Sequence, residues 1–336
     1  CSLTNNTLTI TPVNAGQATI TVTEENAHKT ISYTATVNKI ASSLTCETNK
    51  VYNTNEQTIA TGVGCAAITG NKQTNAGTYT VTCTGDNNHN DSTATCSIAK
   101  DDDVIELSSD SGTIAYPAAS TKTFTVTTNK SNGALSCASD DTNVATCSVS
   151  ENTVTVTYVG PGSAELTITN AANSNYNSTS ATYTITCTLQ TYTITLTNTN
   201  ATTSGSTSAT ATYNGSITSI TAPKRVYTVT FSAGTTGATL SGSTTATSTY
   251  TFNGWYTAES GGTKIINANG TLVASVIGYT DSNSKWIKDG GVTLYAQWTA
   301  PSAYSVPTAT KTGYTCTFGT VTNPAIPPLS PAISCK

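Results

Sequence analysis

The chain of 336 residues carries a net charge of −4, and only 10 % of its residues are charged, against about a quarter in typical globular proteins. It has no cluster of Lys and Arg residues that could neutralise nucleic-acid phosphates, so we expect no nucleic-acid partner. It also has no apolar run of membrane-spanning length and no P-loop, G-x-S-x-G or H-E-x-x-H pattern, and we predict a protein that is not an enzyme.

Ten cysteines and two histidines set further limits. In a chain that reads as small β-domains, so many cysteines indicate disulfides formed in an oxidising compartment. No C-x-x-C pair is present, which disfavours zinc ribbons and thioredoxin-type redox sites. His28 and His89 fall in different predicted domains, and neither has a serine or cysteine motif beside it. The histidines therefore suggest no catalytic pair.

The first predicted strands belong to an internal repeat. Residues 1–23 align without gaps on residues 147–169, with Gly16 on Gly162. Every apolar position keeps its parity, as a shared strand register requires. The matched apolar residues are Leu3, Leu8, Ile10, Val13, Ile20 and Val22 in the first copy and Val149, Val154, Val156, Val159, Leu166 and Ile168 in the second.

The two copies of the repeat differ in what precedes them. Further strands are predicted between residues 103 and 146, ahead of the second copy, and none ahead of the first. We therefore expect residues 1–38 to be the C-terminal part of a domain in a longer polypeptide. Two alternatives stay open: Cys1 is a lipidated N-terminal cysteine, or another subunit supplies the missing strands by β-strand addition.

Period-two alternation of apolar and polar residues continues along almost the whole chain. It is clearest at residues 78–83, 153–158 and 182–197, where Thr alternates with Val, Ile, Leu and Tyr. Such alternation places one face of a strand in a core and the other in water. Gly, Asn, Asp and Pro separate these runs at the spacing of sandwich strands. The sequence therefore predicts an all-β fold without an amphipathic helix.

Two regions resemble known bacterial surface modules. Residues 50–53 read K-V-Y-N and residues 75–81 read N-A-G-T-Y-T-V, and on these motifs the region 39–100 resembles MBG or YDG-type repeats. Residues 144–146 read V-A-T and residues 160–168 read G-P-G-S-A-E-L-T-I, and on these the region 101–189 resembles group 2 bacterial Ig-like domains.

A third resemblance covers residues 190–300. The motifs Y-T-F-N-G-W-Y at residues 250–256, G-G-T at 261–263 and T-L-Y-A-Q-W at 293–298 make this region similar to the Listeria–Bacteroides repeat, also called the internalin B-repeat. Residues 301–336, with G-Y-T at 313–315, are expected to form a partial C-terminal β module.

The three families occur in tandem in bacterial adhesins, invasins and wall-anchored stalks. The resemblance implies an elongated, disulfide-stapled array of small Ig-like or β-sandwich and B-repeat domains on the outside of a bacterial cell. Its expected partners are neighbouring domains, copies of itself or a host-surface ligand. The expected modules are 1–38, 39–100, 101–189, 190–300 and 301–336.

The cysteine spacing suggests which bridges form. The four expected pairs each join cysteines that are neighbours along the chain, because such pairs flank turns; four cysteines in one module still allow three pairings. Two cysteines, Cys1 and Cys187, are left unpaired or available for an intermolecular bridge. The expected pairs are Cys137–Cys147, Cys83–Cys96, Cys46–Cys65 and Cys316–Cys335.

Two further groups of residues suggest sites. Asp101, Asp102, Asp103 and Glu106 lie at a predicted module junction and are candidate ligands of a structural Ca²⁺, although a solvated acidic linker is the favoured interpretation. No other cofactor is expected. Trp286 lies between two lysines in a polar segment, which makes it the best candidate for an exposed, glycan-stacking aromatic residue. The alternative is that Trp286 caps the core of its own domain.

Three functions remain as hypotheses. The first is a structural stalk or fibre segment of an extracellular surface protein, and it rests on the low charge, the cysteines and the repeat. The second is an adhesin that binds a host glycan or protein. The third is an accessory region of a secreted enzyme whose catalytic domain lies elsewhere.

Overall fold

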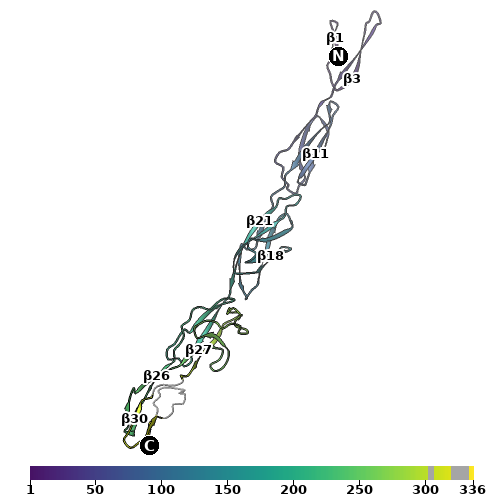
Figure 1. Cartoon of the computed structure of the whole chain (residues 1–336). Coiled ribbons are helices and arrows are strands. Elements are labelled where there is room, and N and C mark those ends of the chain that lie inside the picture. Colours follow the sequence, from purple (N-terminus) through teal and green to yellow (C-terminus); the bar gives the residue numbers. More distant parts are fainter. Residues whose placement is uncertain (302–305, 319–332) are drawn as a thin grey trace. The chain divides into compact units, whose positions relative to one another are not determined.

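The structure is a computed structural model that describes residues 1–301, 306–318 and 333–336 (Figure 1). Strands make up nearly all of the regular structure in these residues, so the predicted all-β fold is confirmed. The one helical element among them is a short 3₁₀ turn, η1 (Gly234–Thr236), and no helix there could cross a membrane. The chain divides into two compact units, which comprise residues 1–112, 122–159 and 163–185, and residues 113–121, 160–162 and 186–336.

Residues 1–38 form two separate two-stranded antiparallel sheets. The pairing sets Leu3 opposite Leu8 in one sheet and Ile20 opposite Tyr33 in the other. The turn of the first hairpin places Asn5 and Asn6 at φ 48° and 61°, a left-handed conformation that Asn tolerates well. The strands are β1 (Ser2–Thr4), β2 (Thr7–Thr9), β3 (Gly16–Thr23) and β4 (Thr30–Val37).

Residues 39–100 form a small β module around a buried apolar cluster. Strand β11 is central, between β13 and β9, and β6 pairs with β8. Ile59, Ala60, Val81, Cys96 and Ile98 form the core. Cys96 and Ile98 are alternate residues of β13 and face inward together, whereas Ile59 lies between β7 and β8. The strands are β5 (Ile40–Ala41), β6 (Ser43–Cys46), β7 (Gln57–Thr58), β8 (Ala60–Val63), β9 (Cys65–Thr69), β10 (Lys72–Gln73), β11 (Gly77–Gly85), β12 (His89–Asn90) and β13 (Ser92–Ile98).

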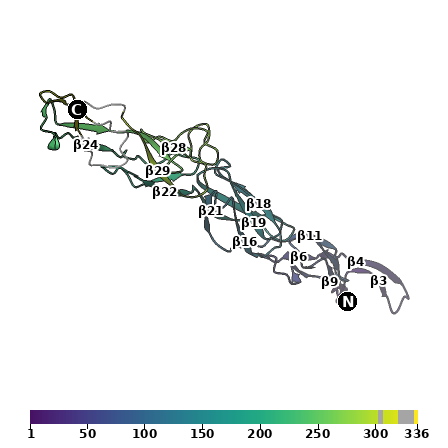
Figure 2. The ribbon, with the colours of Figure 1, turned by 90° about the horizontal axis from the view of Figure 1, so that it is seen from below.

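The region 103–189 contains two four-stranded sheets, ordered β14-β16-β19-β18 and β15-β21-β20-β17. Phe124 of one sheet stacks on Tyr183 of the other, so the two sheets share one core. Figure 2 labels β16, β18, β19 and β21 of this region. The strands are β14 (Ile105–Leu107), β15 (Ser111–Tyr116), β16 (Thr121–Asn129), β17 (Leu135–Ser139), β18 (Ala145–Ser150), β19 (Thr153–Tyr158), β20 (Gly162–Asn170) and β21 (Thr179–Leu189).

The internal repeat is visible in the backbone. Strand β18 pairs with β19 so that Val149 lies opposite Val154, which is the register of Leu3 and Leu8 in the first copy. Gly16 and Gly162, at matched positions, share the left-handed φ values of 144° and 149°. Strands β1, β2 and β3 therefore correspond to β18, β19 and β20.

The region 190–300 is built on a five-stranded sheet of order β23-β22-β29-β27-β28. Strand β22 pairs in parallel with β29, so residues about one hundred positions apart lie side by side (Figure 2). Trp255 and Trp286 are fully buried in the core of this region. The strands are β22 (Thr191–Thr197), β23 (Ser208–Thr212), β27 (Thr251–Tyr256), β28 (Lys264–Asn267) and β29 (Val292–Thr299).

Further short strands pair outside this sheet. Strand β24 (Val226–Thr230) pairs with β26 (Thr245–Thr249), and β25 (Thr239–Ser241) pairs with β30 (Thr308–Thr310). Phe231 packs edge-to-face on Phe318, with ring centroids 5.1 Å apart. The described residues beyond 301 therefore contact residues 231–241. Their last two strands are β31 (Cys316–Phe318) and β32 (Ile333–Cys335).

Candidate functional site

The candidate site is a network of polar and aromatic contacts that joins the module of residues 39–100 to the next module. Its centre is the segment 99–101. The N–H of Ala99 donates to the carbonyl of Lys50 at 2.8 Å, and the carbonyl of Ala99 accepts from Tyr52 at 3.0 Å. Two residues later, the N–H of Asp101 donates to Asn175 at 3.0 Å, and its carbonyl accepts from Asn177 at 2.9 Å. Only Lys100 separates a residue bonded to one module from a residue bonded to the other.

Side chains from both modules close around this segment. The rings of Tyr52 and Tyr176 meet edge-to-face, with centroids 5.3 Å apart and planes at 82°. The amide of Asn175 accepts a bond from the N–H of Ala76 at 2.9 Å and donates to the amide oxygen of Asn75 at 3.2 Å. Aromatic pairs of this geometry and paired amides both favour one fixed arrangement of their partners.

An ion pair completes the junction. The Nζ atom of Lys130 lies 2.7 Å from a carboxylate oxygen of Asp101 and 5.4 Å from the centre of the Tyr176 ring. The hydrogen bond from Lys130 lowers the pKa of Asp101, and the same bond raises the pKa of Lys130. Because both side chains are partly exposed, the pair contributes modestly to stability.

The predicted cation site at Asp101, Asp102, Asp103 and Glu106 is wrong. Among residues 1–301, 306–318 and 333–336, no group of three or more His, Cys, Asp or Glu side chains is placed to hold a metal ion. The four carboxylates instead bind four different polar partners, which draws them apart. Asp101 binds Lys130, Asp102 binds Asn177, Asp103 binds Ser131 and Glu106 binds Thr128.

Asp103 has a structural role instead. Its side chain is almost fully buried, and its oxygens accept from the N–H of Val104 at 2.8 Å, the hydroxyl of Ser131 at 2.6 Å and the amide of Asn170 at 2.5 Å. A buried carboxylate needs such donors, since an unpaired one would be costly. Asp103 and Asn170 therefore fix the turn after β16 against the end of β20.

The disulfides of residues 39–100 differ from the predicted Cys83–Cys96 and Cys46–Cys65 pairs. The structure joins Cys46 to Cys96 and Cys65 to Cys83. In the β11–β13 hairpin, Cys83 lies opposite Ser92, whereas Cys96 lies opposite Tyr79. Four residues of strand separate the two sulfurs, which is too far for a bridge. Each cysteine therefore pairs with a strand beyond the hairpin.

The other two bridges have the predicted partners. Cys137 on β17 is joined to Cys147 on β18, so this bridge links the two sheets of the region 103–189. Cys316 and Cys335 lie directly opposite each other on β31 and β32. Four disulfides in one chain are typical of proteins that fold outside the cytoplasm.

Two described cysteines are free, Cys1 and Cys187. Cys1 is exposed, as an intermolecular bridge would require. Cys187 is only 2 % exposed, and burial raises the pKa of its thiol. The prediction that Cys187 is available for an intermolecular bridge is therefore wrong, because its sulfur faces a core.

Trp286 is not an exposed aromatic residue. Its side chain is fully buried. Its backbone is hydrogen-bonded to residues 214 and 215 in a neighbouring loop, and its ring packs edge-to-face on Tyr279.

Of the two histidines, His89 lies 2.6 Å from a carboxylate oxygen of Asp86 in the turn after β11. This hydrogen bond lowers the pKa of Asp86 and stabilises the turn.

Sequence reasoning missed the junction residues Tyr52, Tyr176, Asn75, Asn175 and Lys130. They come from four separate loops and strand ends. Tyr52 and Asn75 lie in the K-V-Y-N and N-A-G-T-Y-T-V motifs, but those motifs indicated a family resemblance and not a junction, and the other three residues lie in no motif. A search with protein-family models finds no match to the chain, and neither does a search of curated proteins. The resemblances of the individual modules therefore stay predictions.

Proposed function

We propose that this chain is a structural segment of an extracellular bacterial surface protein. Its tandem β modules hold other parts of that protein at a distance from one another. The observation that carries the proposal is the junction at residues 99–101. A flexible linker would contain unpaired backbone that samples many conformations. Here Ala99 and Asp101, on either side of Lys100, each have the backbone N–H and the carbonyl hydrogen-bonded. The connection between the two modules is therefore fixed in one conformation.

The modules suit such a role by their composition. Thr-rich outer strand faces stay hydrated without charge, and the core of residues 39–100 is small, with Ile59, Val81 and Ile98 as its large aliphatic side chains. Small cores are marginal on their own, and disulfides compensate by restricting the unfolded chain. A cross-linked β module also limits how far the chain lengthens when it is pulled.

Recognition of a host ligand is less well supported than spacing. An exposed aromatic cluster would favour the adhesin hypothesis, but Trp286 and Trp255 are both fully buried. The residues with the most elaborate contacts, at the junction, bind each other. We therefore propose spacing as the function, without catalysis by this chain.

The test is module replacement in the producing bacterium. Residues 39–189 of the native protein are replaced by two unrelated, disulfide-linked β-sandwich domains with a similarly short connection. If the segment acts as a spacer, surface display of the flanking regions and attachment of the cells to their natural surface stay unchanged. Antibody labelling of intact cells and a cell-attachment assay measure the two properties.

A matched control replaces the same residues with a flexible Gly/Ser linker of equal residue number. A spacer function predicts that this variant loses attachment even though it is exported, because a flexible chain samples many end-to-end distances and does not hold the flanking regions at a fixed separation. Loss of attachment with the sandwich replacement as well would contradict the proposal and would point to specific recognition by residues 39–189.

A further inference from the structure

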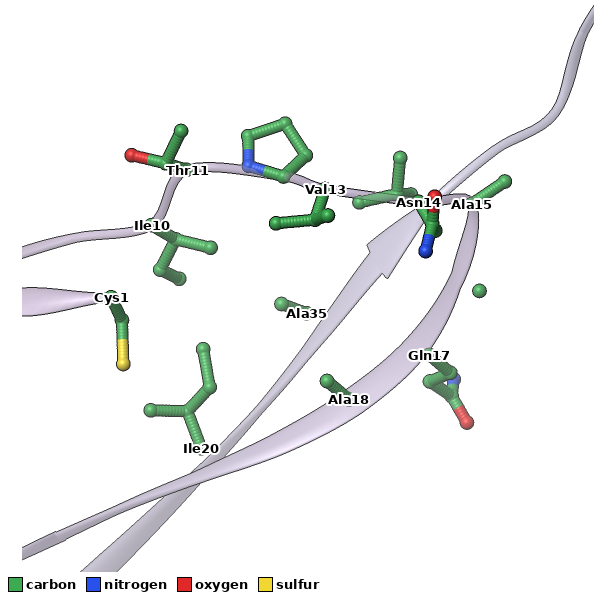
Figure 3. Close-up of a pocket in the computed structure, with 13 residues that line it drawn as sticks. Cys1, Ile10, Thr11, Val13, Asn14, Ala15, Gln17, Ala18, Ile20 and Ala35 are labelled. Atoms are coloured by element: carbon green, nitrogen blue, oxygen red, sulfur yellow. The ribbon is translucent and has the colours of Figure 1, made fainter. Parts of the chain in front are cut away.

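Residues 1–38 expose the apolar face that their repeat partner buries. Tyr33 corresponds to Tyr183 when Val37 is matched with Cys187, and the two rings are 57 % and 0 % exposed. Ile10 is 37 % exposed, whereas its counterpart Val156 is fully buried. Figure 3 shows Ile10, Val13, Ala18 and Ile20 around one opening, with the side chain of Cys1 at its edge. This opening is a groove of about 390 Å³.

The free edges of these strands correspond to occupied edges in the second copy. There, β19 is flanked by β18 and β16, β20 by β21 and β17, and β21 by β20 and β15. In residues 1–38, β2 pairs only with β1, and β3 only with β4, among the residues that the structure describes. The edges that would receive counterparts of β16, β17 and β15 are therefore open.

The strands that fill these places in the second copy all come from residues 105–139. They supply the buried side chains Ile114, Phe124 and Val126 and the cysteine that bridges to Cys147. Phe124 stacks on Tyr183 at a centroid distance of 3.9 Å. The repeat thus specifies both what a complementary segment must look like and where its aromatic ring and its sulfur must lie.

We propose that the apolar face of residues 1–38 binds a β-strand segment of the type formed by residues 105–139, which pairs with the unpaired strand edges. The segment supplies strands at the edges of β2, β3 and β4, an aromatic ring on Tyr33 and a thiol that forms a disulfide with Cys1. Strand addition of this kind gains backbone hydrogen bonds and side-chain burial together. The bridge forms in an oxidising environment, where an oxidant such as oxidised glutathione accepts the two electrons and two protons of the thiols.

The probe for this site is a peptide of residues 103–146 of the same sequence, which contains Cys137 as its single cysteine. It is mixed with the full chain in a redox buffer of reduced and oxidised glutathione. We expect a 1:1 complex in which non-reducing peptide mapping finds a disulfide between Cys1 and the peptide's Cys137. A peptide with Cys137→Ser is expected to bind without the covalent bond.

Matched variants locate the binding face. Ile20→Lys puts a charge on the open face of β3 and is expected to weaken binding of the peptide by roughly tenfold or more. Thr19→Lys puts the same charge on the opposite face of the same strand and should leave binding unchanged. Equal binding by both variants would overturn the proposal.

A fusion protein tests the same binding when the free peptide is too disordered to bind. Residues 103–146 are placed directly ahead of Cys1 in the full chain, as they stand ahead of Cys147. We expect the grafted cysteine to bridge to Cys1 and the amides of β3 and β4 to become protected from hydrogen exchange. Failure of the fusion to form this bridge and this protection would overturn the proposal.

Self-association of the chain through the same face would also contradict the proposal. If the full chain forms a dimer on its own, and Ile20→Lys abolishes that dimer while Thr19→Lys does not, the face binds a second copy of itself. Mass photometry of the chain without peptide measures this directly.

Discussion

Phe124 lies flat against Tyr183, with ring centroids 3.9 Å apart and planes within 8° of each other. The two residues come from different sheets, β16 and β21, and both are almost completely buried. Their contact is the centre of the core between the two sheets. The counterpart of Tyr183 in the first copy, Tyr33, has no such cover and is exposed.

Replacing Phe124 with Ala should destabilise the module of residues 103–189 by about 3–5 kcal/mol, because it removes a buried ring and leaves a cavity against Tyr183. The local free energy of opening is measured by hydrogen exchange of the β20 amides, which report this module separately from the rest of the chain. Thr123→Ala, on the exposed face of β16, is the control and should change it by less than about 0.5 kcal/mol. Equal effects of the two substitutions would show that the ring pair is not central to the core.

Trypsin should release the four cysteines of residues 39–100 as one disulfide-linked species of three peptides. Cleavage after Lys50, Lys72 and Lys100 gives peptides 40–50, 51–72 and 73–100, and both bridges lead to the third of these. The pairs Cys46–Cys65 and Cys83–Cys96 would instead give a two-peptide species and a separate looped peptide. A second cleavage before Asp91 separates Cys83 from Cys96 and assigns each bridge by mass spectrometry.

The two bridges should also differ in how much they stabilise the module. Loop closure predicts a loss of about 4 kcal/mol for Cys46→Ala with Cys96→Ala and about 3 kcal/mol for Cys65→Ala with Cys83→Ala. The difference arises because the bridged cysteines are 50 and 18 residues apart. Urea denaturation monitored by hydrogen exchange of β11 gives both values. A larger loss from the shorter loop would indicate that strain or packing outweighs loop closure.

The two free cysteines should react with thiol reagents at very different rates. Cys1 is exposed, whereas Cys187 is buried and its pKa is raised by that burial, so little thiolate is present at neutral pH. We expect one thiol to be labelled in the folded chain and two after denaturation. Cys1→Ser should abolish labelling of the folded chain. Rapid labelling of Cys187 in the native state would contradict its placement in the core.

The pKa of Tyr192 should lie well above the ordinary value for a tyrosine side chain. Burial, aided by a 2.5 Å hydrogen bond to the carboxylate of Asp289, raises the pKa of Tyr192 to about 12. Since this folded pKa lies above the unfolded value near 10, the contribution of Tyr192 to stability is complete below pH 10 and is lost as the pH rises towards 12. The difference in tyrosinate absorbance between the parent chain and Tyr192→Phe follows this titration.

Asp289→Asn provides the control for that titration. Removing the carboxylate takes away a negative charge that opposes ionisation, so the pKa of Tyr192 should fall but stay above that of an exposed tyrosine, because burial remains. A pKa unchanged by this substitution would show that the hydrogen bond to Asp289 does not form in solution.

The sequence by itself determined the strands and their faces. The run T-V-T-V-T-Y at residues 153–158 predicts a strand, and β19 has those bounds. The gapless repeat predicts a shared register, and the hairpins β1–β2 and β18–β19 have it. These features follow from alternation along a single strand and from one tight turn, so a short window of sequence contains all the information they need.

Contacts between distant strands were decided only by the tertiary structure. Cys83 and Cys96 are close in sequence, but the hairpin register sets them four residues apart and brings Cys65 and Cys46 to them from other strands. Trp286 lies in a polar segment, yet a loop more than seventy residues away covers it. The carboxylates at residues 101–106 find their partners far along the chain. Because burial and pairing depend on which strands pack together, no pattern within one segment can specify them.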